Sequence, residues 1–128
     1  MTEGTDLNWL LDELVTKVPE IHQVVLLSRD GLVMSASKGL TDPDARFLAA
    51  LSSGYFSLAN GAREHFEAQA VRQAVIEIDD KLFFVLPAGA GSCLAVLADA
   101  GRNTRMVAYE TAMLIKRVRG HLVAAPRQ

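Results

Sequence analysis

The stretch DPDARFLAALSSGYFSLANGAREHFE, residues 42–67, determines how the rest of this 128-residue chain is organised. Asp42 can cap a helix through its carboxylate, and Pro43 follows at the first helical position, where a missing amide hydrogen does no harm. The next proline is Pro87. The stretch therefore predicts one uninterrupted helix of roughly 37 Å, at a rise of about 1.5 Å per residue.

This helix has two separate apolar stripes when its residues are placed on a helical wheel. The first stripe is expected to dock the helix onto its own domain and contains Ala45, Leu48, Ser52, Tyr55, Phe56, Ala59, Ala62 and Phe66. The second stripe advances alternately by four and three residues and contains Phe47, Leu51, Gly54, Leu58, Gly61 and His65. The remaining face is polar and contains Arg46, Ser53, Ser57, Asn60, Glu64 and Glu67.

One apolar stripe suffices to hold a helix on its own domain, so a second stripe needs a second partner. Alternating steps of three and four are typical of a seam against another helix. Gly54 and Gly61 lie in this seam, and each costs about 1 kcal/mol relative to alanine inside a helix. Close approach of another backbone would compensate for that cost. We therefore predict an intermolecular surface; burial of both faces within one chain is the alternative.

Length and composition indicate a single globular domain over residues 1–128, since half of the residues are apolar and 22% are charged. The net charge of −2 argues against a nucleic-acid partner. No apolar run approaches the length of a membrane span, and the polar, acidic first residues do not resemble a secretory signal. A single cysteine, Cys93, excludes an intrachain disulfide. We expect a cytoplasmic protein.

Two further helices are predicted from apolar positions that repeat with helical spacing. The first follows a cap at Asp6 and ends before Pro19; its stripe contains Leu7, Leu10, Leu11, Leu14, Val15 and Val18. The last begins after Asn103 or Thr104 and reaches about residue 122. Its stripe contains Val107, Thr111, Leu114, Ile115, Val118 and Leu122.

Five strands complete the predicted order, α-β-β-α-β-β-β-α. Residues 21–28 and 32–37 form a hairpin around Asp30-Gly31, a strong turn signal. Residues 70–78, 81–88 and 93–98 follow as a meander, which predicts an α+β fold with a mostly antiparallel sheet. The segments 81–88 and 93–98 are apolar throughout and should be central. The segment 70–78 carries Arg72, Gln73 and Glu77, which predicts an edge strand that needs either protection or a partner.

A search for chemistry finds no active site, metal site or cofactor site. His22, His65 and His121 fall on three different elements without the spacing of metal ligands. Cys93 begins an apolar strand, where a cysteine behaves as a small hydrophobe. Gly89 and Gly91 fit a turn between strands better than a dinucleotide fingerprint. The sequence therefore predicts that the protein is not an enzyme, with a reactive Cys93 as a minor alternative.

The order and spacing of these elements resemble the roadblock/dynein light chain family over about residues 5–123. The most recognisable segment is LLSRDGLV, residues 26–33, in which Asp-Gly joins two hydrophobic strands. The size of the chain is similar to that of bacterial members, particularly the actinobacterial ones encoded in four-gene conservons. Those members are encoded beside a histidine-kinase-like membrane protein and a small Ras-like GTPase.

The resemblance implies an α/β sandwich with strand order 2-1-5-4-3, the second helix on one face and the first and third helices on the other. It also implies a homodimer in which the third strands pair edge to edge and the second helices pack together. The residues that this arrangement places in the dimer interface are Phe47, Leu51, Gly54, Leu58, Gly61, Arg72, Gln73, Ala74, Val75 and Ile76.

We therefore expect a non-catalytic regulatory scaffold that binds a small Ras-like GTPase and changes its nucleotide state or its location. The histidine-kinase-like membrane protein is a further implied partner, which would hold a cytoplasmic protein at the membrane. The exposed residues expected to dock the GTPase are Arg46, Ala50, Ser53, Ser57 and Asn60. The alternative function is a small-molecule sensor with a pocket between sheet and helix, although no convergent polar groups mark such a pocket.

Overall fold

The computed structural model describes residues 6–101 and 103–124 and has the predicted order of elements. Residues 1–5, where the predicted core begins, and the tail 125–128 lie outside the described residues. The helices are α1 (Asn8–Lys17), α2 (Asp42–His65) and α3 (Thr104–Ala124). The strands are β1 (Ile21–Ser28), β2 (Val33–Ala36), β3 (Ala74–Ile78), β4 (Lys81–Gly89) and β5 (Ser92–Asp99).

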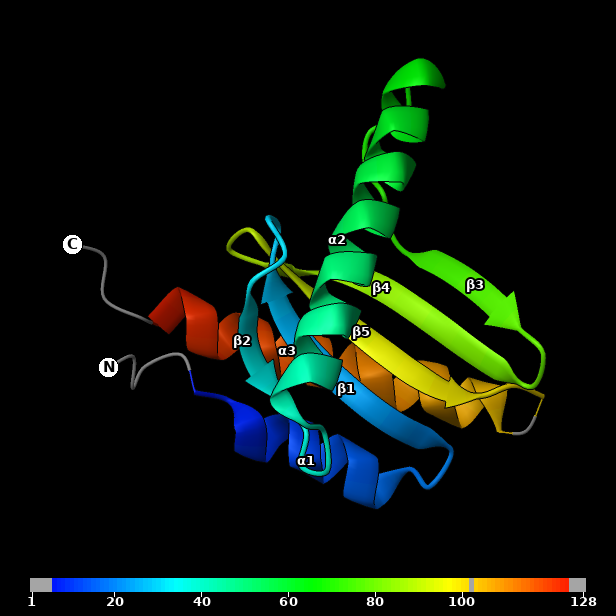
Figure 1. The fold of residues 1–128 in the computed structure, drawn as a ribbon. Helices are drawn as coiled ribbons and strands as arrows, with labels where there is room; N and C mark the ends of the chain where they lie inside the picture. Colours follow the sequence, from blue (N-terminus) through cyan, green and yellow to red (C-terminus); the bar gives the residue numbers. More distant parts are fainter. Residues whose placement is uncertain (1–5, 102, 125–128) are drawn as a thin grey trace.

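The five strands form one antiparallel sheet in the order β2-β1-β5-β4-β3. Helix α2 crosses one face of this sheet, while α1 and α3 cover the other face (Figure 1). The predicted sandwich and its strand order are confirmed. The apolar segments predicted to be central form β4 and β5, and both lie in the interior of the sheet.

Strand β1 shows how one sheet supplies two core layers. Alternate side chains of a strand point to opposite faces. Val24 and Leu26 pack with α1 and α3, whereas Val25 and Leu27 pack with α2. All four are fully buried. The apolar stripes predicted for the first and last helices lie in the α1–α3 layer, as expected from their spacing.

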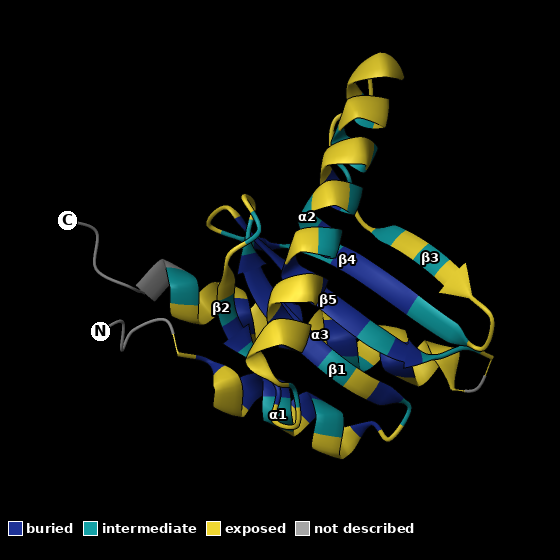
Figure 2. Ribbon diagram, viewed as in Figure 1, coloured by how far each residue is buried: buried dark blue, intermediate teal, exposed yellow. Residues whose placement is uncertain are grey.

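Helix α2 begins and ends slightly differently from the prediction. Its N-cap is Thr41 and not Asp42, because the Thr41 hydroxyl accepts the Asp44 amide at 3.2 Å. Its last turns extend past the end of the sheet (Figures 1 and 2). Ala62 and Phe66 lie there and are exposed, so the expectation that they pack on their own domain is wrong.

Strand β3 begins at Ala74, so Arg72 and Gln73 precede it and the strand predicted from residue 70 is too long. Ala74 pairs with Val85 on β4. Continuing this register would place Arg72 opposite Pro87, which has no amide hydrogen to donate to the ladder. The pairing therefore ends before that position.

Candidate functional site

The second stripe of α2 is open to solvent. Phe47 is 64% exposed and Leu58 is 73% exposed, while Leu51 is half-buried. Exposed aromatic and aliphatic side chains on one helix face are unusual unless a partner covers them. In the described chain, the alternative in which one chain buries both faces of this helix is not observed.

The two glycines of this stripe have space around them. A Cβ atom placed on Gly54 or on Gly61 would meet nothing within 4 Å in the described chain. Their own chain therefore gives no steric reason for glycine at these helical positions. The helix-propensity cost of about 1 kcal/mol at each one is left without compensation inside the chain.

The sheet has two edges, and they differ. At the β2 edge, two backbone amides donate to side chains of α1. The Ala36 amide donates to the Asn8 side-chain oxygen at 2.9 Å, and the Lys38 amide donates to an Asp12 carboxylate oxygen at 2.6 Å. Two outward-facing amides of this edge are therefore already bonded.

The β3 edge has no such cover. Alternate residues of an edge strand direct their N–H and C=O groups away from the sheet. Within residues 6–101 and 103–124, no side chain bonds these outer groups of β3. Val75 is 48% exposed and Ile78 is 58% exposed. The sheet can therefore be extended at this edge.

The open edge and the open stripe lie on the same side of the molecule. Ala74 and Ile76 of β3 are half-buried and pack into the core layer that also holds Leu51 of α2. Arg72 and Gln73 are exposed immediately before the strand. The structure thus brings Leu51, Ala74 and Ile76 of the predicted interface into one layer and leaves Phe47, Leu58 and Val75 exposed on the same two elements.

The five residues predicted to dock a GTPase are in different situations. Arg46, Ala50 and Ser57 are exposed. Ser53 is half-buried, and its hydroxyl donates to the Arg29 carbonyl at 2.7 Å, which ties α2 to the β1–β2 turn.

Asn60 is also half-buried, and its side-chain oxygen accepts a bond from Arg63 Nε at 2.8 Å. Three of the five side chains are therefore free to meet a partner, and two already have polar partners within the chain.

An open hollow of about 680 Å³ lies between the first turns of α2 and the β1–β2 hairpin, next to Arg46 and Ala50. The contact between α2 and the centre of the sheet is closed. It is filled by apolar side chains, including Leu48, Phe56 and Phe83. Ser52 is buried there, and its hydroxyl donates to the Leu48 carbonyl of its own helix at 2.7 Å. This hydroxyl is satisfied locally and is not available to orient a small molecule.

Cys93, the nucleophile of the minor alternative, lies in a setting that does not activate it. Cys93 is buried, and burial raises the pKa of its thiol, which disfavours the nucleophilic thiolate. Across the described residues, no group of His, Cys, Asp and Glu is placed to hold a metal ion.

An ionic cluster joins side chains of β1, β4 and β5. There Asp99 bonds to His22 at 2.8 Å and to Lys81 at 3.2 Å. The His22 bond, followed by Lys81, lowers the pKa of the Asp99 carboxyl.

The described chain is thus a sandwich that leaves one helix face and one sheet edge uncovered. Residues 7–98 match the model of the Roadblock/LC7 domain, and the chain belongs to this family. No helix in the described part of the chain is long and apolar enough to cross a membrane.

Solved structures support this assignment. A Roadblock/LC7 domain from Streptomyces avermitilis is 47% identical with a TM-score of 0.87, over 93% of this chain and 99% of the other. A second Streptomyces Roadblock/LC7 domain is 40% identical with a TM-score of 0.72, over 87% and 96%.

Myxococcus xanthus MglB has the same fold at 17% identity, with a TM-score of 0.83 over 92% of this chain and 95% of the other. Among curated proteins, no sequence matches the chain. The chain is thus a bacterial member of the family.

Proposed function

We propose that this protein is a non-catalytic regulatory scaffold that acts as a homodimer and binds a small Ras-like GTPase. The observation that supports the proposal is the exposed α2 stripe together with the open edge of β3, a strand that packs in the same layer as α2. Exposed apolar surfaces of this kind are typical of sites that bind other proteins. The position of this stripe and edge agrees with the way in which roadblock proteins are expected to pair.

The dimer would form by antiparallel pairing of the two β3 edges, which continues the sheet from one protomer into its partner. Both copies of α2 then lie on the same face of the extended sheet. Phe47, Leu51 and Leu58 would lose their exposure to water, at a gain of about 25 cal/mol for each Å² of apolar area buried. Gly54 and Gly61 would let the two helices approach closely.

The paired helices would form the platform on which the GTPase docks. Arg46, Ala50 and Ser57 would border that platform and contact the GTPase directly. A scaffold that binds one nucleotide state more tightly shifts the GTPase toward that state without supplying a catalytic group. The histidine-kinase-like membrane protein implied by the resemblance to conservon members would locate the complex at the membrane.

The test is co-purification with each small Ras-like GTPase encoded in the same genome, followed by measurements of nucleotide hydrolysis and exchange. We expect one GTPase to bind, and Arg46→Glu to weaken binding by about tenfold through charge reversal at the rim. Lys116→Glu on α3 makes the same charge change on the opposite face and should leave binding unaltered. If no GTPase binds and no rate changes, the proposed function is wrong.

A further inference from the structure

A second group of exposed apolar side chains lies on the opposite face of the molecule. Trp9 on α1 and three residues on α3, Met106, Tyr109 and Met113, are each between 38% and 60% exposed. Because α1 and α3 cover the face of the sheet opposite α2, the proposed dimer would leave this group uncovered.

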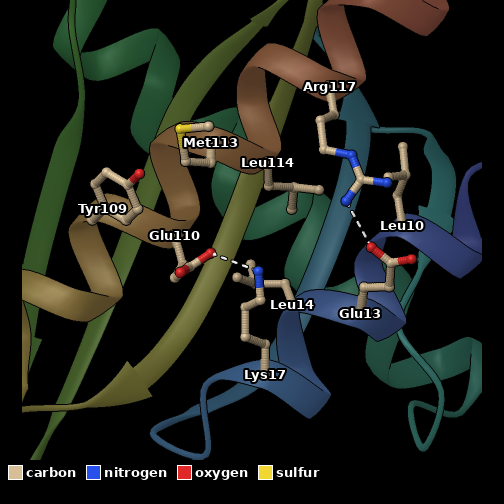
Figure 3. Close-up of a pocket in the computed structure, with 9 residues that line it drawn as sticks. All are labelled: Leu10, Glu13, Leu14, Lys17, Tyr109, Glu110, Met113, Leu114 and Arg117. Atoms are coloured by element: carbon tan, nitrogen blue, oxygen red, sulfur yellow. Dashed lines mark hydrogen bonds and ion pairs between the residues drawn. The ribbon is translucent and has the colours of Figure 1, made fainter.

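Two of these side chains, Tyr109 and Met113, border a groove between α1 and α3 with a volume of about 250 Å³ (Figure 3). Its floor is apolar and consists of Leu10, Leu14 and Leu114. Tyr109 and Met113 form the wall on the α3 side. Methionine adapts its shape to different apolar partners, which suits a binding surface.

Two ion pairs cross the groove (Figure 3). Glu13 binds Arg117 at 2.6 Å, and Lys17 binds Glu110 at 3.5 Å. Residue numbers increase along α1 from the first pair to the second and decrease along α3, so the two helices run antiparallel. Neighbouring helices of this kind present a groove into which the ridge of a third helix can pack.

The outer side of α3 is basic. Residues 104–124 contain four Arg or Lys residues and a single acidic residue, Glu110, in a chain whose net charge is −2. Lys17 already pairs with Glu110, and Glu13 with Arg117. Among the described residues, Arg105, Lys116 and Arg119 form no ion pair. Acidic groups on a partner would complement these charges.

We propose that the groove between α1 and α3 binds an amphipathic helix of a second protein, with bulky apolar side chains in the groove and acidic residues on its flank. The apolar side chains would contact the exposed Tyr109 and Met113, above the buried floor of the groove. The acidic flank would face Arg105 and Lys116. A helix in a groove is a recurrent mode of peptide recognition, and here it would give the scaffold a partner site separate from its dimer face.

A lipid surface fits the same face less well. Glu13 and Glu110 stand on the rim of the groove and would face the phosphates of an anionic bilayer. In a protein complex they keep their partners Arg117 and Lys17 and fix the position of the bound helix. The groove is also concave, whereas a bilayer contacts a flat or convex surface.

Two synthetic amphipathic helices test the proposal. They share one leucine stripe and differ only in their flanking residues, which are glutamate in one and lysine in the other. Titration into the labelled dimer, followed by NMR, should show about tenfold tighter binding of the glutamate helix at low salt. The largest shifts should fall on residues 10–17 and 109–117. Equal affinities, shifts elsewhere or no binding would overturn the proposal.

Variants assign the site. Met113→Glu should weaken binding of the glutamate helix by about tenfold. Lys116→Glu should reduce the difference in affinity between the glutamate helix and the lysine helix. Leu32→Glu places the same charge at another exposed apolar position, on the β1–β2 turn, and should change neither affinity. Met113→Glu should still dimerise and bind a GTPase, so failure here is distinct from failure of the proposed function. Binding to anionic vesicles but to neither helix would assign the surface to lipid and contradict the proposal.

Discussion

The Asp12 carboxylate accepts the backbone amide of Lys38 at 2.6 Å, and this bond joins α1 to the end of the β2 edge. Asn8, one helical turn earlier, accepts the Ala36 amide at 2.9 Å. The two side chains occupy donors that would otherwise pair with another strand. A sheet with one capped edge and one open edge can pair with only one other sheet. This favours a closed dimer over an open polymer.

Removal of both caps should therefore change the assembly. In the double variant Asn8→Ala, Asp12→Ala, two exposed edge amides lose their acceptors, and we expect species larger than a dimer in light scattering on a sizing column. The loss of two hydrogen bonds should also lower the free energy of unfolding by about 1 kcal/mol for each. Asp12→Asn keeps the accepting oxygen and serves as the control. A double variant with the wild-type mass would show that these caps do not limit assembly.

Leu58→Glu should convert a dimer into a folded monomer. Leu58 is exposed in the single chain, so a carboxylate there leaves the fold intact. Buried between two helices without a partner, the same carboxylate costs several kcal/mol, and about 3 kcal/mol already weakens association more than 100-fold. Solution mass and circular dichroism measured together provide the test, with Leu32→Glu as the matched control. A wild-type protein that is already monomeric, or a variant that remains dimeric, would contradict the proposed seam.

Gly54→Ala separates the stability of the chain from the stability of the dimer. In the described chain nothing lies within 4 Å of the added methyl group. Alanine should therefore raise the stability of the monomer by about 1 kcal/mol through helix propensity. Between two closely packed helices the same methyl group would collide with the partner and weaken association. In the otherwise wild-type protein we expect Gly54→Ala to raise the dimer dissociation constant. In the monomeric Leu58→Glu variant we expect it to raise the melting temperature. If Gly54→Ala instead improves association, a close helix crossing is ruled out.

The helices and the hairpin could be predicted from sequence because their signals are local. The two stripes of α2 follow from residue spacing alone, and both are found where the spacing places them over the part of the helix that lies on the sheet. Gly31 has a φ of +92°, which agrees with the turn predicted at Asp30-Gly31. The spacing of apolar residues along a helix does not show where the sheet beneath it ends. For this reason Phe66 was expected to pack on its own domain, although it is exposed.

The interactions that decide how the surfaces are used join residues far apart in the chain. Ser53 bonds to Arg29 across 24 positions, and Asp12 bonds to Lys38 across 26. Asn8 and Asp12 are four residues apart on the polar face of α1. This spacing is the one feature of the local sequence that indicates that both side chains cap the β2 edge. For the same reason Ser53 was predicted to be free on a solvent face, although its hydroxyl is bonded.

Cys93 should react with a disulfide reagent only when the protein opens. Its side chain is 1% exposed, and burial raises the pKa of the thiol, so little thiolate is present at neutral pH. In native buffer we expect a rate that falls as the free energy of unfolding rises, and a rapid reaction in denaturant. Fast modification of the native protein would instead support the alternative in which Cys93 is a nucleophile.

The cluster of Asp99, His22 and Lys81 should make stability depend on pH in the acid range. In the folded protein the His22 hydrogen bond, followed by that of Lys81, holds the pKa of Asp99 below its usual value of 3.8. The unfolded chain therefore takes up a proton first as the pH falls. The stabilisation is fully present above that usual value and is lost as the pH falls through the folded pKa.

Asp99→Asn should accordingly be less stable than the wild type at neutral pH, and the difference should narrow as the pH falls below about 4. His22→Gln removes the largest cause of the shift and should reproduce much of the effect. Urea unfolding followed over this pH range measures it. Because Asp99 and His22 lie on β5 and β1, which do not adjoin β3 in the sheet, each variant should keep the wild-type oligomeric state. Stability curves of wild type and Asp99→Asn that run parallel through the acid range would show that these bonds do not stabilise the fold.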